Sequence, residues 1–170
     1  TAQNWLNNQI LRAMGAEVIQ TRSDVQKGHP EYYQDMAERL AEEHGYFYVN
    51  QFANPANVAA HYQTTGPEIW QQMKGQLDAF VCGVGSGGTL TGIGRYLREQ
   101  NAAIDLVLAD PEGSILEPLI NRNEDVTPGS WLVEGIGEDF IPSICDIKLA
   151  NKAYAISDKE AFLTARELLV

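Results

Sequence analysis

Residues 81–92, VCGVGSGGTLTG, decide the fold of this chain. The apolar run 79–82 before the glycines predicts a buried strand, and the segment from Leu90 onward predicts a helix with an apolar stripe. That stripe is formed by Leu90, Ile93, Tyr96 and Leu97. The glycines between strand and helix let the backbone come close to a ligand and adopt positive φ. A strand, a glycine turn and a helix start in this order are typical of a phosphate-binding site.

The start of the predicted helix explains why an anion would bind there. Its first N–H groups have no intrahelical acceptor and lie at the positive end of the helix dipole, where a negative charge is stabilised. Ser86, Thr89 and Thr91 add hydroxyl donors. The plain alternative is a tight turn without a ligand, but four glycines within six positions are more than such a turn needs.

The same glycines fit a second class of site. Gly83, Gly85 and Gly88 match the dinucleotide-binding spacing, and Asp110 follows at roughly the 20-residue distance of the ribose-binding acid. A triphosphate-binding loop does not match, because no Gly-Lys-Ser/Thr closes the turn. A nicotinamide-dependent dehydrogenase domain is therefore a competing hypothesis, against which stands Pro111 directly after Asp110.

The composition narrows the class of protein. The 170 residues carry a formal net charge of −11, which argues against nucleic-acid binding, because that depends on lysine and arginine. Any phosphate would then be held by main-chain dipoles rather than by a basic patch. The sequence has no apolar run long enough to span a bilayer and no signal-peptide pattern. Cys82 and Cys145 form no Cys-x-x-Cys pair, so we expect a reduced, cytoplasmic protein with Cys82 in its core.

Periodicity and capping residues predict the remaining elements. The expected helices are 1–14, 31–44, one that begins at 65–68, and 159–170 with Asp158 as its cap. The expected strands are 16–21, 46–50, 104–110 and one within 148–157. Residues 118–130 are expected to form a surface loop because they are polar and rich in Asn, Pro and Gly.

The three histidines were weighed as ligands. His29 and His44 are expected to be structural, because neither has a second ligand at metal spacing and His44 suits a helix C-terminus. For His61 the structural and functional interpretations stay open. We expect no metal site in this chain.

Three blocks of the sequence occur together in one known family. They are QFANPANVAAHYQTTGPEI (51–69), VGSGGTLTGIGRYL (84–97) and the pair DPEGSIL and VEGIGEDFIP (110–116 and 133–142). In this order they resemble the cystathionine β-synthase and cysteine synthase family, enzymes of fold type II that use pyridoxal 5'-phosphate. LRAMGAEVI (11–19) is similar to the small domain of that family. The resemblance covers nearly the whole chain.

The resemblance implies an α/β fold. A parallel sheet with flanking helices would form part of the two-domain, tryptophan synthase β-like architecture of fold type II. Residues 1–50 would be the remainder of the small N-terminal domain, and residues 51–170 the large cofactor-binding domain, truncated at its C-terminal end. The resemblance also implies a homodimer that takes small-molecule amino-acid and thiol substrates, with neither nucleic acid nor membrane as partner.

The resemblance assigns the cofactor-binding residues. The family has a Gly-Thr-Gly-Gly-Thr phosphate cup, which this chain matches with serine in place of one threonine. The matching residues are Gly85, Ser86, Gly87, Gly88 and Thr89. Gly135 falls in the loop that closes beside the cofactor ring, and Gln51 falls where the family places a glutamine near the substrate carboxylate. Glu138 stands where vertebrate cystathionine β-synthases have tyrosine, which leaves the second substrate open.

The lysine that holds the cofactor in this family lies upstream of the region matched here, in a Ser-x-Lys context. None of the lysines of this chain has that context: Lys27, Lys74, Lys148, Lys152 and Lys159. The family's asparagine loop and the serine at the pyridine nitrogen would also lie outside the chain. We therefore expect an internal fragment of a longer enzyme, with no catalytic residue of its own and no turnover by itself.

The implied reaction of the whole enzyme is a β-replacement. The β-substituent of serine or O-acetylserine is exchanged for a thiol such as homocysteine or sulfide. DPEGSI and VEGIG favour cystathionine β-synthase, a transsulfuration enzyme that joins serine and homocysteine, whereas NPAN and TTGPEI fit cysteine synthase equally well. A third hypothesis is a non-catalytic fragment that retains the phosphate site.

Overall fold

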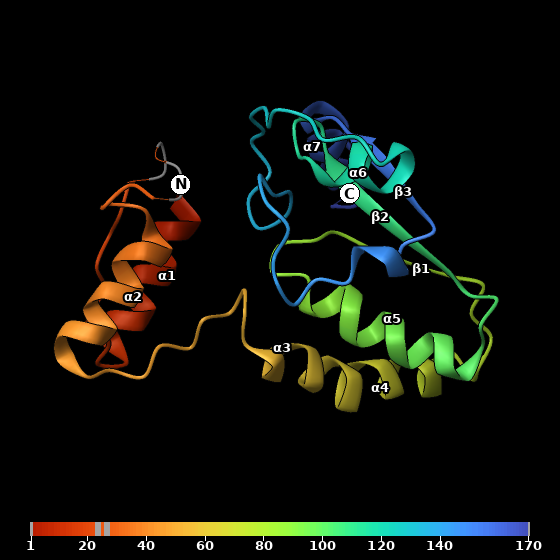
Figure 1. Ribbon diagram of the computed structural model, residues 1–170, viewed down its shortest axis with the longest axis horizontal. Coiled ribbons are helices and arrows are strands. Elements are labelled where there is room, and N and C mark those ends of the chain that lie inside the picture. Colours follow the sequence, from red (N-terminus) through yellow and green to blue (C-terminus); the bar gives the residue numbers. More distant parts are fainter. Residues whose placement is uncertain (1, 23–24, 26–27, 170) are drawn as a thin grey trace. The chain divides into compact units, whose positions relative to one another are not determined.

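The computed structural model describes residues 2–22, 25 and 28–169, and the side chains of residues 2–6 lie outside the description. The chain forms two compact units, Thr1–Asn50 and Gln51–Val170 (Figure 1). The second unit begins at the residue where the sequence predicts a second domain. The assignment of the two units to a small and a large domain stays a prediction.

The first unit contains two helices at the predicted places, α1 (Ala2–Ala13) and α2 (Tyr33–His44). Gly45 ends α2 in the left-handed conformation with φ 68°, and its N–H donates to the carbonyl of Ala41. His44 lies in the last turn of α2, as expected. His29 has a local contact, because its Nδ1 accepts from the N–H of Glu31 at 3.1 Å.

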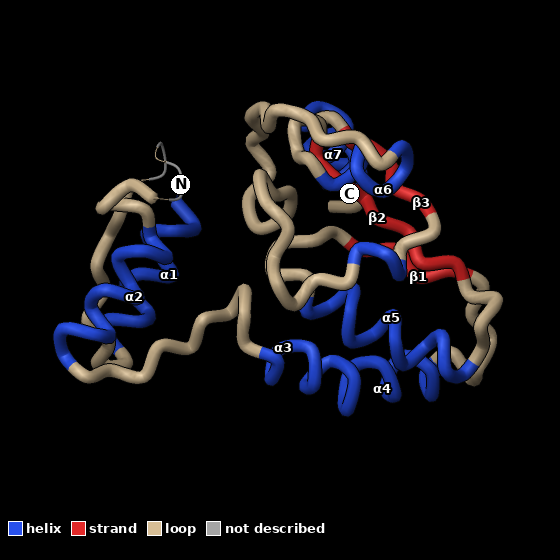
Figure 2. The backbone as a smooth tube through the Cα atoms, viewed as in Figure 1, coloured by secondary structure: helices blue, strands red, loops and turns tan. Residues whose placement is uncertain are grey.

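The two strands predicted for the first unit are wrong. Residues 16–21 and 46–50 run as loop (Figure 2). An extended segment becomes a strand only where a neighbouring strand supplies hydrogen bonds, and none of the described residues of this unit does so. Apolar side chains of α1 are also exposed: Ile10 is 50% and Met14, just after the helix, 80% accessible.

The second unit is built on a parallel sheet with helices on both sides, which confirms the α/β prediction (Figure 1). Its strands are β1 (Ala79–Cys82), β2 (Asp105–Pro111) and β3 (Lys152–Ile156), in that order across the sheet. In register, Phe80 pairs with Leu106 and Leu108 pairs with Ala153.

The strand β1 is less buried than predicted. Exposed and half-buried residues alternate along it, and Val81 is 59% accessible. Within the described residues β1 pairs only with β2, so it forms an edge of the sheet and one of its faces stays uncovered.

Helix α5 (Gly88–Gln100) connects β1 to β2 and carries the predicted stripe. Leu90, Ile93 and Leu97 are at most 1% accessible. They divide between two apolar clusters, one with Val84, Leu108 and Leu116 and one with Ile104 and Leu106. The glycine turn therefore lies directly above buried apolar packing.

The helix expected to begin at 65–68 starts earlier. It runs through α3 (Pro55–Ala60), a π-helical turn η1 (His61–Thr65) and α4 (Gly66–Gln72). The true N-cap is Asn54, whose side chain accepts from the N–H of Ala56 at 3.0 Å. Pro67 lies inside this continuous run, as the second residue of α4, shortly after the π-helical turn. Such wide turns are common near functional sites.

Two further boundaries differ from the predictions. Part of the expected loop 118–130 is helix α6 (Leu116–Arg122), because Leu116 and Pro118 are buried against the sheet. The last helix, α7 (Asp158–Glu167), is capped by Ser157 rather than Asp158. Ser157 and Glu160 form a reciprocal capping box.

The packing of α5 can be tested by truncating its central leucine. Leu97 is fully buried, so Leu97→Ala should reduce the free energy of unfolding by about 2–5 kcal/mol through lost contacts and the cavity left behind. Leu132 is 71% accessible, so the control Leu132→Ala should change it by less than about 0.5 kcal/mol. Urea denaturation measures both, and equal effects would contradict the placement of α5.

Candidate phosphate-binding site

The glycine turn leads from the end of β1 into α5. Gly87 is the N-cap residue in the left-handed conformation, with φ 82°. The N–H of Thr91 donates to the carbonyl of Gly87 at 3.0 Å and makes the first hydrogen bond of the helix. A Cβ atom on Gly87 would also collide with the side chain of Cys145, so only glycine fits this position.

Six consecutive main-chain N–H groups at this turn are free for a ligand. Within the described residues, the amides of residues 85–90 donate to no protein acceptor. They stand at the N-terminus of a helix of 13 residues that has no acidic side chain in its first turn. Because main-chain donors next to a packed core need an acceptor, this arrangement fits a phosphate ester.

The hydroxyl group of Ser86 is oriented by a side chain of α3. Asn57 Nδ2 donates to Ser86 Oγ at 2.9 Å and to the main-chain oxygen of Gln51 at 3.0 Å. Ser86 thus accepts from the protein and keeps its own proton for a ligand oxygen. The same asparagine packs against Gly88, where a Cβ atom would strike its amide. Asn57 therefore holds the turn, and it also brings the main chain of Gln51 to the site.

The hydroxyl group of Thr89 is approached by His61 from the π-helical turn. His61 Nε2 lies 3.4 Å from Thr89 Oγ1, and its Nδ1 lies 3.1 Å from Thr65 Oγ1. The structure thus places His61, whose role was open from the sequence, beside the phosphate cup rather than at a distance from it.

The loop that contains Gly135 is attached to the same turn. A Cβ atom on Gly85 would lie 2.6 Å from the carbonyl oxygen of Gly135, so the two backbones are in direct contact. Gly137 donates to the carbonyl of Val84 at 2.9 Å, which fixes the loop to the end of β1. The cofactor-binding residues that the resemblance implies are therefore adjacent here. The hydroxyl of Thr91, also expected to be a donor for the phosphate, is not available, because Thr91 is fully buried and donates to the carbonyl of Ile144 at 3.1 Å.

Asp110 has a structural role. Its side chain is fully buried, and Oδ2 accepts from the N–H of Glu117 at 2.9 Å at the start of α6. Burial raises the pKa of this carboxyl group. No solvent-exposed atom is left to meet a ribose hydroxyl, so the structure does not support the dinucleotide hypothesis.

The main chain of Glu138 is held next to the site by hydrogen bonds with the side chain of Ser114. Ser114 Oγ accepts from the N–H of Glu138 at 3.1 Å and donates to its carbonyl oxygen at 3.2 Å. The Glu138 carboxyl group is half-buried, and burial raises its pKa to about 8, with the negative charges of Asp139 and Asp110 adding to the effect.

The two cysteines lack the character of nucleophiles. Burial raises the pKa of Cys82 to about 11 and that of Cys145 to about 12, so both thiols stay protonated at neutral pH. Cys82 packs against the apolar cluster below the turn, in line with the core role predicted for it.

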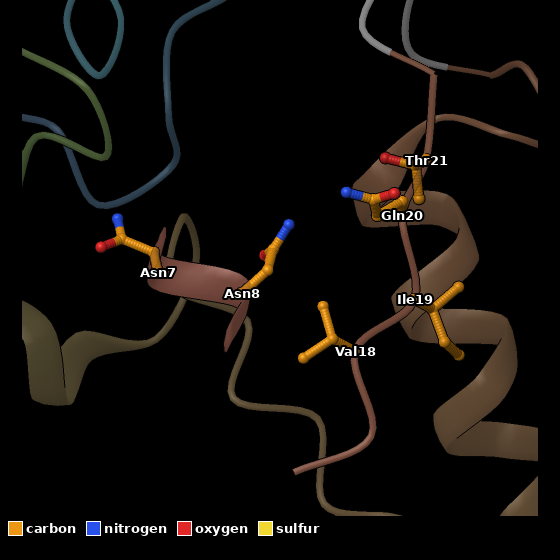
Figure 3. A pocket seen from close by; sticks show the side chains of 6 residues that line it. All are labelled: Asn7, Asn8, Val18, Ile19, Gln20 and Thr21. Atoms are coloured by element: carbon orange, nitrogen blue, oxygen red, sulfur yellow. The ribbon is translucent and has the colours of Figure 1, made fainter. Parts of the chain in front are cut away.

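The first unit has a separate hollow between α1 and the extended segment that follows it (Figure 3). Asn7 and Asn8 line it from the helix, together with residues 18–21. In Figure 3 the side chains of Val18 and Ile19 point to opposite sides, as in any extended chain. Its lining carries no charged group, and it offers no row of main-chain donors at a helix start comparable with that of α5.

Comparison with known proteins identifies the family. The model of the pyridoxal-phosphate dependent enzyme family matches residues 4–170. The chain belongs to this family, whose members use pyridoxal 5'-phosphate, and the fold type II expectation is thereby confirmed.

The relatives fall into two groups. The chain is 39% identical to cystathionine β-synthase of Apis mellifera over 160 residues, 94% of this chain and 31% of the relative. It is 42% identical to cystathionine β-synthase of Oryctolagus cuniculus, covering 94% of this chain and 29% of the relative. It is 40% identical to cysteine synthase A of Escherichia coli K12, again over 94% of this chain and 50% of the relative. The chain thus spans half or less of the length of these curated relatives.

Sequence reasoning missed two residues of the site. Asn57 has no role in the sequence analysis beyond its place in the block 51–69, although an amide near the start of a helix after Asn-Pro is a detectable signal. Ser114 carried no signal beyond a turn, because its contact with Glu138 joins residues 24 positions apart.

Alanine at Gly87 should separate backbone strain from steric conflict. Gly87→Ala imposes a positive φ on alanine and drives its Cβ atom into Cys145, whereas Gly135→Ala at φ 88° meets nothing within 4 Å. Strain alone costs about 1–2 kcal/mol, so Gly87→Ala should cost at least about 1 kcal/mol more than Gly135→Ala in the free energy of unfolding. Equal losses in urea denaturation would contradict the packing of the turn on Cys145.

The raised pKa of Glu138 predicts a pH-dependent stability. The folded protein disfavours the carboxylate, so the contribution of Glu138 to stability is complete below its ordinary pKa and is lost as pH rises towards 8. Glu138→Gln should therefore gain stability over the wild type between pH 5 and pH 8.5. Melting temperatures measure this difference, and the exposed Glu134→Gln serves as the control for loss of one charge. Parallel wild-type and Glu138→Gln curves would refute the assignment.

Proposed function

We propose that the protein containing this chain catalyses a β-replacement on serine-type amino acids. Cystathionine β-synthase activity, from serine and homocysteine to cystathionine, is the first candidate. Cysteine synthase activity, from O-acetylserine and sulfide to cysteine, is the alternative. The observation that carries the proposal is the row of free amides at the start of α5, in a chain about 40% identical to enzymes of both names.

We infer that the free amides hold the phosphate group of the cofactor. The residues concerned are Gly85, Ser86, Gly87, Gly88 and Thr89. The N–H groups would donate to phosphate oxygens, and the hydroxyls of Ser86 and Thr89 would add donors that Asn57 and His61 keep in place. When bound, pyridoxal phosphate supplies the electron-withdrawing ring on which the substrate's bonds are broken. The cup fixes its orientation by the phosphate group.

Gln51 and Gly135 complete the proposed site. Gly135 offers a main-chain carbonyl and an open face next to Gly85, where a ring could lie close to the backbone. Gln51 is tied to the cup by its main-chain contact with Asn57, and its exposed side chain would reach the substrate carboxylate. No residue of this chain is assigned the proton transfer, so we propose that these 170 residues are inactive by themselves.

We also propose a cellular location and an oligomeric state for the protein. Among the described residues, no helix is both long and apolar enough to cross a bilayer. We propose a cytoplasmic enzyme, because Cys82 and Cys145 form no disulfide. We propose a homodimer on the basis of the resemblance.

The substrate pair can be tested on the purified full-length gene product loaded with pyridoxal phosphate. We expect a higher kcat/KM for serine with homocysteine than for O-acetylserine with sulfide, by at least about tenfold, measured by product chromatography. The preparation without cofactor is the control. The reverse preference would establish the cysteine synthase alternative. No turnover with either pair by a cofactor-loaded protein would favour the non-catalytic hypothesis.

A further inference from the structure

The carboxyl group of Glu138 has no partner. Within the described residues its two side-chain oxygens accept no hydrogen bond and form no ion pair, although the side chain is half-buried. A carboxylate withdrawn from water is normally paired, because its desolvation is otherwise uncompensated. Asp110 Oδ1 is the one fully buried side-chain oxygen without a partner among the described residues, so the Glu138 carboxyl group keeps access to solvent and is available to a ligand.

The main chain of Glu138 is held in place by hydrogen bonds. Besides the two hydrogen bonds to Ser114, its carbonyl accepts from the N–H of Ile115 at 3.0 Å. These contacts fasten Glu138 to the turn after β2, while Gly137 is fastened to Val84 after β1. Carboxyl ends of parallel strands are where ligands bind in such sheets.

The Glu138 carboxyl group faces the glycine turn. Its Oε1 atom lies 3.9 Å from the position that a Cβ atom on Gly85 would take. Because Gly85 is the first residue of the proposed phosphate cup, the carboxyl group stands at the rim of the same site. Its position requires no rearrangement of the backbone.

The charged surroundings of Glu138 are acidic. The groups that interact with its charge are Asp139 on the same loop and Asp110 at the end of β2, and the thiol of Cys145 faces it from the next segment. The cup residues 85–89 carry no ionisable side chain. Beside Glu138 the charged side chains therefore favour a cationic group of a ligand, whereas the free amides of residues 85–90 favour an anionic one.

We propose that Glu138 determines the second substrate: its carboxylate binds the ammonium group of an amino-acid thiol and so favours such a thiol over sulfide. This inference rests on the proposed β-replacement. The two candidate nucleophiles differ at this point, because homocysteine carries an ammonium group whereas hydrosulfide is an anion without any donor of that kind. The ammonium group of the thiol substrate would then pair with the Glu138 carboxylate, which has no such partner among the described residues.

Binding of an ammonium group at Glu138 should be coupled to release of a proton from its carboxyl group. In the empty site burial raises the pKa of Glu138 to about 8, so the group is largely protonated at pH 7. An ammonium group stabilises the carboxylate and lowers this pKa. Binding of the amino-acid thiol at pH 7 should therefore release a proton, and KM for that thiol should fall as pH rises towards 8.

The test compares two thiols that differ only in the ammonium group, homocysteine and 4-mercaptobutanoate, on the full-length enzyme loaded with pyridoxal phosphate. The wild type should prefer homocysteine by about 10- to 100-fold in kcat/KM, mainly through KM, as expected for a charged hydrogen bond. Glu138→Gln should reduce this preference to nearly one. Glu134→Gln, the same substitution at an exposed position of the same loop, should preserve it.

Calorimetry gives a readout independent of turnover. Homocysteine titrated into the loaded enzyme at pH 7, in buffers of different ionisation enthalpy, should show proton release with the wild type and with Glu134→Gln. Glu138→Gln should show none.

The outcomes separate the two proposals. If the wild type and Glu138→Gln show the same kcat/KM preference for homocysteine over 4-mercaptobutanoate, the proposed role of Glu138 is wrong. It is also wrong if the wild type itself does not distinguish the two thiols. Conversion of sulfide with rejection of homocysteine overturns it as well but leaves the β-replacement intact. A loaded enzyme that converts neither sulfide nor homocysteine overturns both.

Discussion

The site depends on one constraint: the main-chain donors at the start of α5 have no acceptor among the residues that the structure describes. The amides of residues 85–90 stand over a packed apolar cluster that includes Val84 and Leu90. Core packing fixes the helix, and the helix fixes the direction of its N–H groups. A chain with a net charge of −11 can hold a phosphate group in this way without a lysine or arginine cluster.

Three glycines of the turn each lie against a different neighbour that leaves no room for a side chain. Gly85 is in contact with the backbone of Gly135, Gly87 with Cys145, and Gly88 with Asn57. Each contact attaches another segment to the cup: the loop 133–142, the segment that follows it, and α3. The glycines thus serve assembly of the site as well as access for a ligand, and hydroxyl groups are then oriented by Asn57 and His61 from the helical run 55–72.

Elements whose structure depends on neighbouring residues in the sequence were predicted correctly, whereas elements that depend on distant residues were not. The strand–turn–helix at 79–100 was predicted because its apolar spacing, glycines and polar cap region are all contiguous. The strands predicted at 16–21 and 46–50 failed because pairing depends on another strand, which periodicity cannot supply. Helix α6 was missed since its start is stabilised by Asp110, a residue outside the segment that looked like a loop.

The sequence by itself determined the α/β class, the glycine turn before a helix and the membership of the pyridoxal-phosphate dependent enzyme family, because each depends on contiguous residues with specific spacing. Only the tertiary structure decided that Asn57 and His61 lie at the glycine turn, that Asp110 is a buried cap, and that Glu138 stands near Gly85 with no hydrogen-bond partner for its carboxyl group among the described residues. These relations join residues far apart in the chain, and their physical content is burial and distance, which appear only once the helices have packed on the sheet.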